Sequence, residues 1–254
     1  MRHSGHWNDL SWRSWPYKIR NVDAWLKRYR DRYELGCSES RLWAGQALVS
    51  QATGKVLEVA VGTGQDFVSQ RILDCGCGEG RFCRLLAARG AAYILGLDLC
   101  SLMIEAAEAM KSRCDEYRVA DVQKLGFLDS ETFDLAVSYL NQCDLPDFHA
   151  NNREVFRVLK HGGRFIVANL HPMKSAVGGW HKADDGKKLH VVLDRYFEEG
   201  ERQWNMLGFP FTNFHRPLST YLRGFLDAGF GIADVIEPTV TKAQLQNYPQ
   251  LDMN

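Results

Sequence analysis

The chain has 254 residues, of which 31 are basic and 31 acidic, so its formal net charge is zero. Nucleic-acid-binding domains usually carry a basic excess, because phosphate contacts supply much of their affinity, and this composition argues against a nucleic-acid partner. No run of about 18 apolar residues occurs, so we predict no membrane span. Seven cysteines without a CxxC pair predict reduced thiols, a cytoplasmic location and no metal site.

The first predicted domain, residues 1–70, is helical and rich in aromatic side chains. Five of the seven tryptophans lie within its first 43 residues, and helical spacing covers 22–34 and 39–51. This segment either packs against the main body or closes over a ligand pocket. It ends in a glycine-rich stretch, "VLEVAVGTG" at 56–64, and a second such stretch, "ILDCGCGEG", follows at 72–80. The glycine motif is therefore duplicated.

From residue 71 to 254 we predict one α/β core in which strands alternate with helices. Expected strands are 71–75, 93–99, 117–122, 133–140, 163–171 and 231–238, and expected helices are 81–90, 101–114 with Ser101 as cap, 151–163 and 215–230. This alternation predicts a Rossmann-like, doubly wound, mostly parallel sheet with helices on both faces. Ligands bind such sheets beyond the carboxyl ends of the strands.

Residues 172–210 interrupt this alternation and are expected to form a β-hairpin inserted after the fifth strand. Residues 189–207 would supply its two strands, on either side of Glu199 and Gly200. Aromatic side chains would make it a wall or lid of a substrate pocket; those expected to line the pocket are Trp180, Tyr196, Phe197 and Trp204.

The second glycine stretch is the better candidate for a cofactor loop. A working loop needs a helix behind it and an acidic residue at the end of the next strand, about 20 residues on. The second stretch leads into the helix predicted at 81–90, and Asp98 follows Gly76 by 22 residues. Only six residues separate Gly64 from Arg71, too few for a crossover between parallel strands.

Five segments together resemble the class I S-adenosylmethionine-dependent methyltransferases, most closely the small-molecule branch called type 11. They are "LDCGCGEGRF", "LGLDL", "VADVQKLGF", "FDLAVSYL" and "VLKHGGRFIVANLHP", within a resemblance that covers about 71–237. The resemblance implies S-adenosylmethionine as cofactor and methyl transfer as reaction. It assigns the methionine part to Asp74, Gly76, Cys77, Gly78 and Gly80, and the ribose to Asp98. It assigns the adenine to Asp121 and Val122, with Leu99 and Met103 as apolar cover. Tyr139, Asn141 and Gln142, after the fourth strand, are expected to face the methyl group or the acceptor.

Two alternatives stay open. A dehydrogenase would bind NAD through a similar loop, although dinucleotide sites prefer GxGxxG to the GxGxG spacing seen from Gly76 to Gly80. The duplicated motif, and the absence of the apolar seventh strand with which relatives end, also fit a fused or truncated member that is impaired or non-catalytic.

The acceptor is predicted to be a small molecule. "SYLNQCDLP", after the fourth strand, is not the Asx-Pro-Pro-aromatic motif of many methyltransferases that act on base or amide nitrogens. His171 and His215 are the candidate general bases, because histidine titrates near neutral pH, and the alternative for each is a bond to the backbone. The oligomeric state cannot be read from the sequence.

Overall fold

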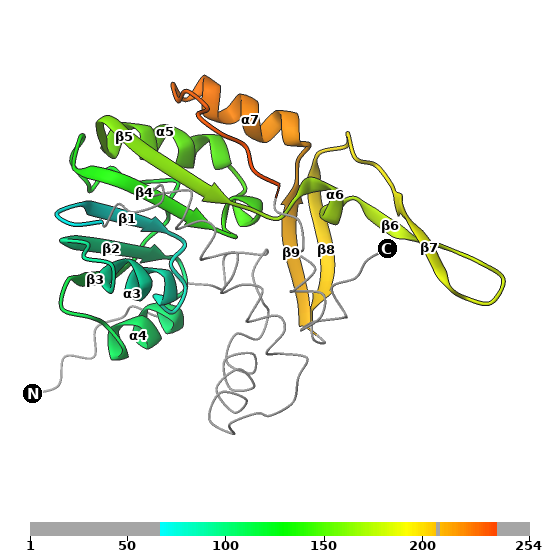
Figure 1. Cartoon of the computed structure of the whole chain (residues 1–254), viewed down its shortest axis with the longest axis horizontal. Coiled ribbons are helices and arrows are strands. Elements are labelled where there is room, and N and C mark those ends of the chain that lie inside the picture. Colours follow the sequence, from blue (N-terminus) through cyan, green and yellow to red (C-terminus); the bar gives the residue numbers. More distant parts are fainter. Residues whose placement is uncertain (1–66, 207–208, 238–254) are drawn as a thin grey trace, which may run out of the picture.

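The computed structural model describes residues 67–206 and 209–237. The tryptophan-rich segment and the first glycine stretch lie outside these ranges. Five strands form one parallel sheet in the order β3-β2-β1-β4-β5 (Figure 1). They are β1 (Arg71–Cys75), β2 (Tyr93–Asp98), β3 (Asp115–Val119), β4 (Phe133–Tyr139) and β5 (Leu159–Ala168). The predicted parallel sheet is confirmed, and β1 occupies its centre.

Helices cover both faces of the sheet, which confirms the doubly wound architecture. Apolar side chains alternate along β1, so that Ile72 packs with α3 and α4 while Leu73 packs with α5 and α7. These helices are α3 (Arg81–Ala87), α4 (Ser101–Ala109), α5 (Phe148–Val158) and α7 (Leu218–Asp227). No helix in the described ranges has both the length and the apolar character needed to cross a membrane.

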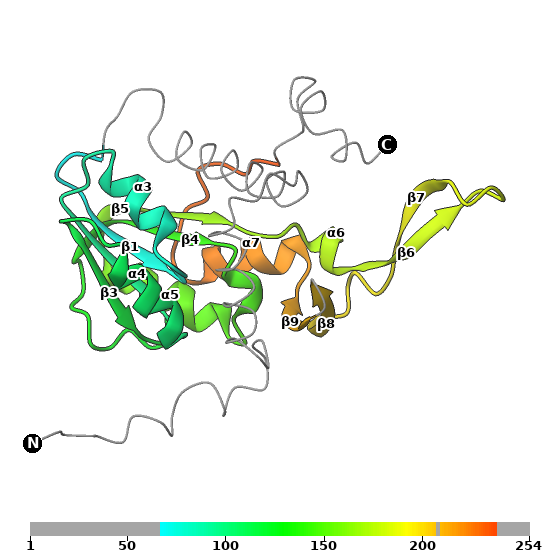
Figure 2. The same cartoon turned by 90° about the horizontal axis from the view of Figure 1, so that it is seen from below.

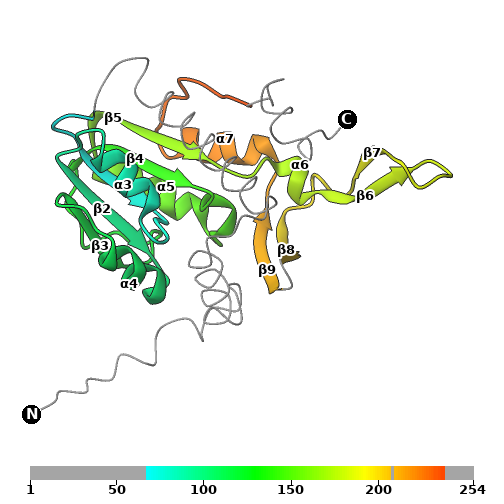
Figure 3. The same ribbon diagram turned by 60° about the horizontal axis from the view of Figure 1, so that its bottom comes forward.

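Two antiparallel hairpins follow β5, where one was expected. After the short helix α6 (Pro172–Ser175), β6 (Val177–Lys182) pairs with β7 (Lys188–Leu193), and β8 (Gly200–Met206) pairs with β9 (Phe209–His215). Figures 1, 2 and 3 all show the β6–β7 ribbon projecting away from the sheet.

The predicted hairpin around Glu199 and Gly200 is therefore wrong in its boundaries. The turn that was missed lies at "ADDG", where Gly186 has φ 83° and donates its N–H to the Ala183 carbonyl at 2.9 Å. An Asp-Gly pair between extended segments favours a tight hairpin turn. This turn pairs β7 with the preceding strand and leaves β8 to pair with the following one.

Several element ends also differ from the predictions. Helix α5 begins at Phe148 because the Asp147 carboxylate caps it, accepting the Ala150 N–H at 2.9 Å. Cys100, not Ser101, occupies the N-cap position of α4, and no side chain caps that end. The predicted sixth strand is wrong for its described part, since residues 231–237 form no strand. That segment has an alternating pattern, but no neighbouring strand among the described residues offers it a ladder of hydrogen bonds.

Candidate functional site

A hollow lies at the carboxyl ends of the central strands, where sequence reasoning expected a ligand. The space inside it that a water molecule can occupy is only about 10 Å³. Its lining residues are Gly76, Asp98, Leu99, Ala120, Asp121, Val122, Asn141 and Leu145. Five of them were predicted cofactor residues, drawn from three separate segments of the chain. The hollow has about the room of one water molecule, so the described residues form a small depression and not a complete ligand pocket.

Asp98 joins the glycine loop to the start of α4 at the edge of this hollow. Its two carboxylate oxygens accept hydrogen bonds from the Gly78 N–H at 3.0 Å and the Cys100 N–H at 2.8 Å. An ionised carboxylate has about four acceptor positions, so Asp98 retains capacity for hydroxyl donors from a ligand.

The three glycines of the loop all adopt left-handed backbone conformations, but they serve different purposes. At Gly76, φ is 80° and a Cβ atom would lie 2.4 Å from the Asn141 side chain, so that site is closed by packing. At Gly78, φ is 55° and nothing lies within 4 Å of the Cβ position. The Cβ position of Gly78 is therefore open, which leaves room for a close approach to the backbone there, although Gly78 does not line the hollow.

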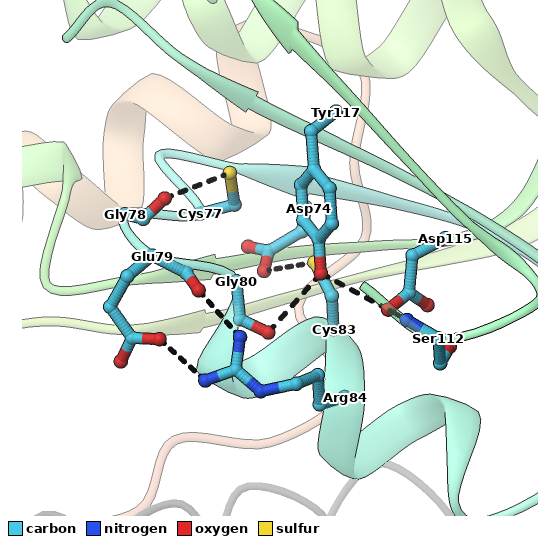
Figure 4. A network of polar contacts seen from close by, with 10 residues as sticks. All are labelled: Asp74, Cys77, Gly78, Glu79, Gly80, Cys83, Arg84, Ser112, Asp115 and Tyr117. Atoms are coloured by element: carbon cyan, nitrogen blue, oxygen red, sulfur yellow. Dashed lines mark hydrogen bonds and ion pairs between the residues drawn. The ribbon is translucent and has the colours of Figure 1, made fainter. Parts of the chain in front are cut away.

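Gly80 packs against Tyr117 on β3 (Figure 4). The Tyr117 hydroxyl donates to the Asp115 carboxylate at 3.1 Å and lies 3.4 Å from the Gly80 carbonyl oxygen. Burial raises the pKa of the Tyr117 hydroxyl far above its usual value, so it remains a neutral donor. This contact holds the last turn of the glycine loop against the sheet.

Gly80→Ala is expected to destabilise the protein by about 2–3 kcal/mol. The new Cβ atom would meet the Tyr117 hydroxyl at 2.4 Å and would adopt φ 75°, and both effects oppose the native conformation. Urea unfolding measures the loss. Gly78→Ala is the matched control, because it carries only the backbone strain of about 1 kcal/mol. Equal losses in the two variants would contradict the packing account.

Asp74 lies beneath the loop rather than in the hollow. Its side chain is 1% exposed, one oxygen accepts the Cys83 thiol at 3.1 Å, and the other has no hydrogen-bond partner among the described residues. Burial raises the pKa of this carboxyl to about 7. The neighbouring Cys77 thiol points to the Gly78 carbonyl at 3.5 Å. Neither Asp74 nor Cys77 lines the hollow.

The raised pKa of Asp74 makes stability depend on pH. The native state holds a proton that the unfolded chain releases near pH 3.8, so the stabilising contribution is present below about pH 4 and is lost as pH rises through 7. Across this pH range the free energy of unfolding falls by on the order of 4 kcal/mol from this group alone. We expect the free energy of unfolding of Asp74→Asn to decline less than that of the wild type between pH 5 and 8. Parallel pH curves for the two proteins would refute this assignment.

A buried polar network supports the segment that carries Asp121 and Val122. The Asn151 amide on α5 donates to the Val122 carbonyl at 2.8 Å, and its oxygen accepts the Gln142 amide at 2.8 Å. Both amide side chains are fully buried. Sequence analysis gave Asn151 no role. The available signal was a pair of asparagines on the apolar face of an amphipathic helix, where a polar side chain needs a specific partner.

Known proteins share the fold of this chain. The family described as "Methyltransferase domain" matches residues 73–167. The crystal structure of an S-adenosylmethionine-dependent methyltransferase from Mesorhizobium loti superposes with a TM-score of 0.66 and 35% identity, covering 74% of this chain and 86% of that one. A structure from Listeria monocytogenes assigned to the same class has a TM-score of 0.68 and 30% identity, covering 80% and 88%. This chain belongs to the class I S-adenosylmethionine-dependent methyltransferases.

A curated relative, methyltransferase phqN from Penicillium fellutanum, is 37% identical over 136 residues, which are 52% of this chain and 39% of that protein. The chain thus matches less than half the length of that relative. Membership of the methyltransferases replaces the dehydrogenase alternative. The family match begins at residue 73 and so includes only the second glycine stretch.

The residues of this methyltransferase that were predicted to act as bases are both engaged in other contacts. The His171 ring accepts the Met173 N–H at 3.2 Å and pairs with Glu237 at 2.6 Å. His215 is fully buried; one ring nitrogen donates to the Tyr196 carbonyl at 2.7 Å, and the other lies 2.6 Å from the Ser175 hydroxyl. The histidines thus tie α6 and β9 to neighbouring segments, and their catalytic role stays a prediction.

Four other predicted cofactor residues do not line the hollow: Gly78, Gly80, Met103 and Tyr139. Met103 is half-buried on α4. Tyr139 ends β4 and stacks on Phe82, with ring centroids 6.2 Å apart. Asn141, which was expected to face the methyl group or the acceptor, lines the hollow. Its amide nitrogen is buried at the hollow without a hydrogen-bond partner among the described residues, as expected of a donor that serves a ligand.

Proposed function

We propose that the chain binds S-adenosylmethionine at this hollow and transfers its methyl group to a small-molecule acceptor. The observation that carries the proposal is the convergence of the Asp98 carboxylate and the glycine loop at the carboxyl ends of β1 and β2. The open backbone at Gly78 and the unsatisfied Asn141 amide also fit this cofactor. The bound cofactor supplies a methyl group already activated by a sulfonium.

The chain's own residues would bind the cofactor and orient its methyl group. Asp98 would accept the ribose hydroxyls, and Asp121 and Val122 would contact the adenine. Gln123 orients Asp121, because one oxygen of Asp121 accepts both the N–H and the side-chain amide of Gln123, and this supports the proposal by leaving the other oxygen for a donor. Since displacement at an activated carbon needs mainly proximity and alignment, these contacts would account for much of the rate.

The small-molecule acceptor is supported by the neutral charge of the chain and by the sequence after β4. The acceptor would lie near Tyr139 and Asn141, beside the methyl group. The β8–β9 hairpin lies beside the segment after β4 (Figure 3) and would form the outer wall of its pocket.

Calorimetry of the full chain with S-adenosylhomocysteine, followed by a labelled-methyl screen of hydroxyl, amine and carbon acceptors, tests the proposal. Heat of binding together with turnover of at least one acceptor is expected. Absence of both heat and thermal shift would refute cofactor binding. Binding without turnover would favour an impaired homologue that retains the cofactor site.

Once an acceptor is known, His171→Ala and His215→Ala test the general base. A base contributes about 10²–10⁴-fold, so the true base should lose that much turnover while affinity for the cofactor is unchanged. His215→Ala should also lose about 2–3 kcal/mol of stability, because it removes two buried hydrogen bonds. Unchanged turnover in both variants would leave alignment as the whole mechanism.

A further inference from the structure

Arg216 is a buried cation that neither the family resemblance nor the cofactor site explains. It follows β9 at the start of α7, and its side chain is 7% exposed. Removing a guanidinium from water is unfavourable unless its donors are satisfied, so a buried arginine indicates a demanding set of partners. Those partners lie on the segment after β4, about 70 residues earlier in the chain.

The guanidinium donates to main-chain carbonyls of that segment. One terminal nitrogen bonds the Leu145 carbonyl at 2.7 Å and the Pro146 carbonyl at 2.8 Å, and the other lies 3.5 Å from the Gln142 carbonyl. Only a planar fork of donors can reach several carbonyls of one turn, and a lysine ammonium would satisfy fewer. These carbonyls belong to residues 142–146, which include the short 3₁₀ helix η2 (Gln142–Asp144).

Aromatic rings fix the guanidinium from its other sides. Its central carbon lies 4.7 Å from the ring centre of Phe148, 5.4 Å from that of Phe214 and 6.0 Å from that of Tyr221. Such ring faces attract a cation and restrict its orientation. Because the rings come from α5, β9 and α7, the guanidinium is anchored to three elements while it bonds a fourth.

The segment that Arg216 bonds also lines the cofactor hollow. Asn141 and Leu145 are lining residues, and the Asn141 side chain packs directly against Gly76 of the glycine loop. A shift of this segment would therefore move the wall of the hollow and loosen the loop behind it. We propose that Arg216 is a positioning residue, which holds residues 141–146 in the conformation that binds the cofactor.

The test, which rests on the proposed function for its ligand, compares Arg216→Met, Arg216→Lys and the control Arg223→Met. Arg223 is exposed on α7, the helix that follows Arg216. We expect Arg216→Met to raise the Kd for S-adenosylhomocysteine about tenfold and Arg216→Lys about threefold, because lysine keeps the charge but fewer of the hydrogen bonds. Arg223→Met should match the wild type.

Amide hydrogen exchange without ligand provides the second readout. Arg216→Met should speed exchange at residues 141–147 about tenfold and leave β1 and β2 protected. If Arg216→Met does not fold, the Kd and the exchange at residues 141–147 are measured in Arg216→Lys instead, where the smaller, about threefold rise in Kd is expected. Unchanged exchange at 141–147, an unchanged Kd, or a uniform rise across the sheet would each overturn the proposal. If wild-type protein binds no S-adenosylhomocysteine, the proposed function fails, and exchange alone decides whether Arg216 holds the segment.

Discussion

Asp98→Ala should weaken S-adenosylhomocysteine binding at least about 100-fold. The carboxylate would accept two ribose hydroxyls, and a hydrogen bond to a charged group contributes about 1.5–3 kcal/mol. The same side chain holds the N–H groups of Gly78 and Cys100, so its removal also frees the loop that carries the cofactor. Both losses act in the same direction on the measured affinity.

Calorimetry with three variants separates these effects. Asp98→Asn keeps an oxygen that can accept one of the two backbone N–H groups, and should fall between wild type and Asp98→Ala. Asp129→Ala, which changes an exposed carboxylate away from the hollow, should bind as the wild type does. Wild-type affinity in Asp98→Ala would show that the ligand does not use this carboxylate.

Gly78→Val should abolish cofactor binding while the protein stays folded. The structure separates these outcomes, because the Cβ position at Gly78 meets no protein atom within 4 Å, whereas the Cβ position at Gly76 or Gly80 meets a buried side chain at 2.4 Å. A valine at Gly78 would therefore strain only its own backbone, by about 1–2 kcal/mol. Its branched side chain would occupy the space where the cofactor must approach the loop.

The sheet was predictable from the sequence because its signals are local and repeated. Each buried strand is a short apolar run followed by turn residues, and strands that alternate with helices have few possible arrangements. Asp98 was singled out by its spacing after the glycine loop and Asp121 by the family resemblance, and the structure places both at the carboxyl edge of the sheet.

The parts that were missed depend on partners distant in the sequence. Residues 231–237 have a strand pattern, but a strand forms only where another edge pairs with it, and the sequence does not show the edge. Asn151 and Arg216 look like ordinary helical residues until the structure brings Val122 and Leu145 to them. The contacts of His215, a candidate base at the start of a predicted helix, likewise come from distant residues, since its ring is buried between Ser175 and Tyr196.

The central claim is that the second glycine stretch, not the first, holds the cofactor. Its most direct test is a calorimetric titration of S-adenosylhomocysteine into Gly78→Val and Gly64→Val, with circular dichroism to establish that each is folded. Gly64 lies outside the described residues and belongs to the stretch that no predicted crossover follows. We predict no heat of binding with Gly78→Val and wild-type affinity with Gly64→Val. Binding by folded Gly78→Val, with its loss in folded Gly64→Val, would contradict the claim.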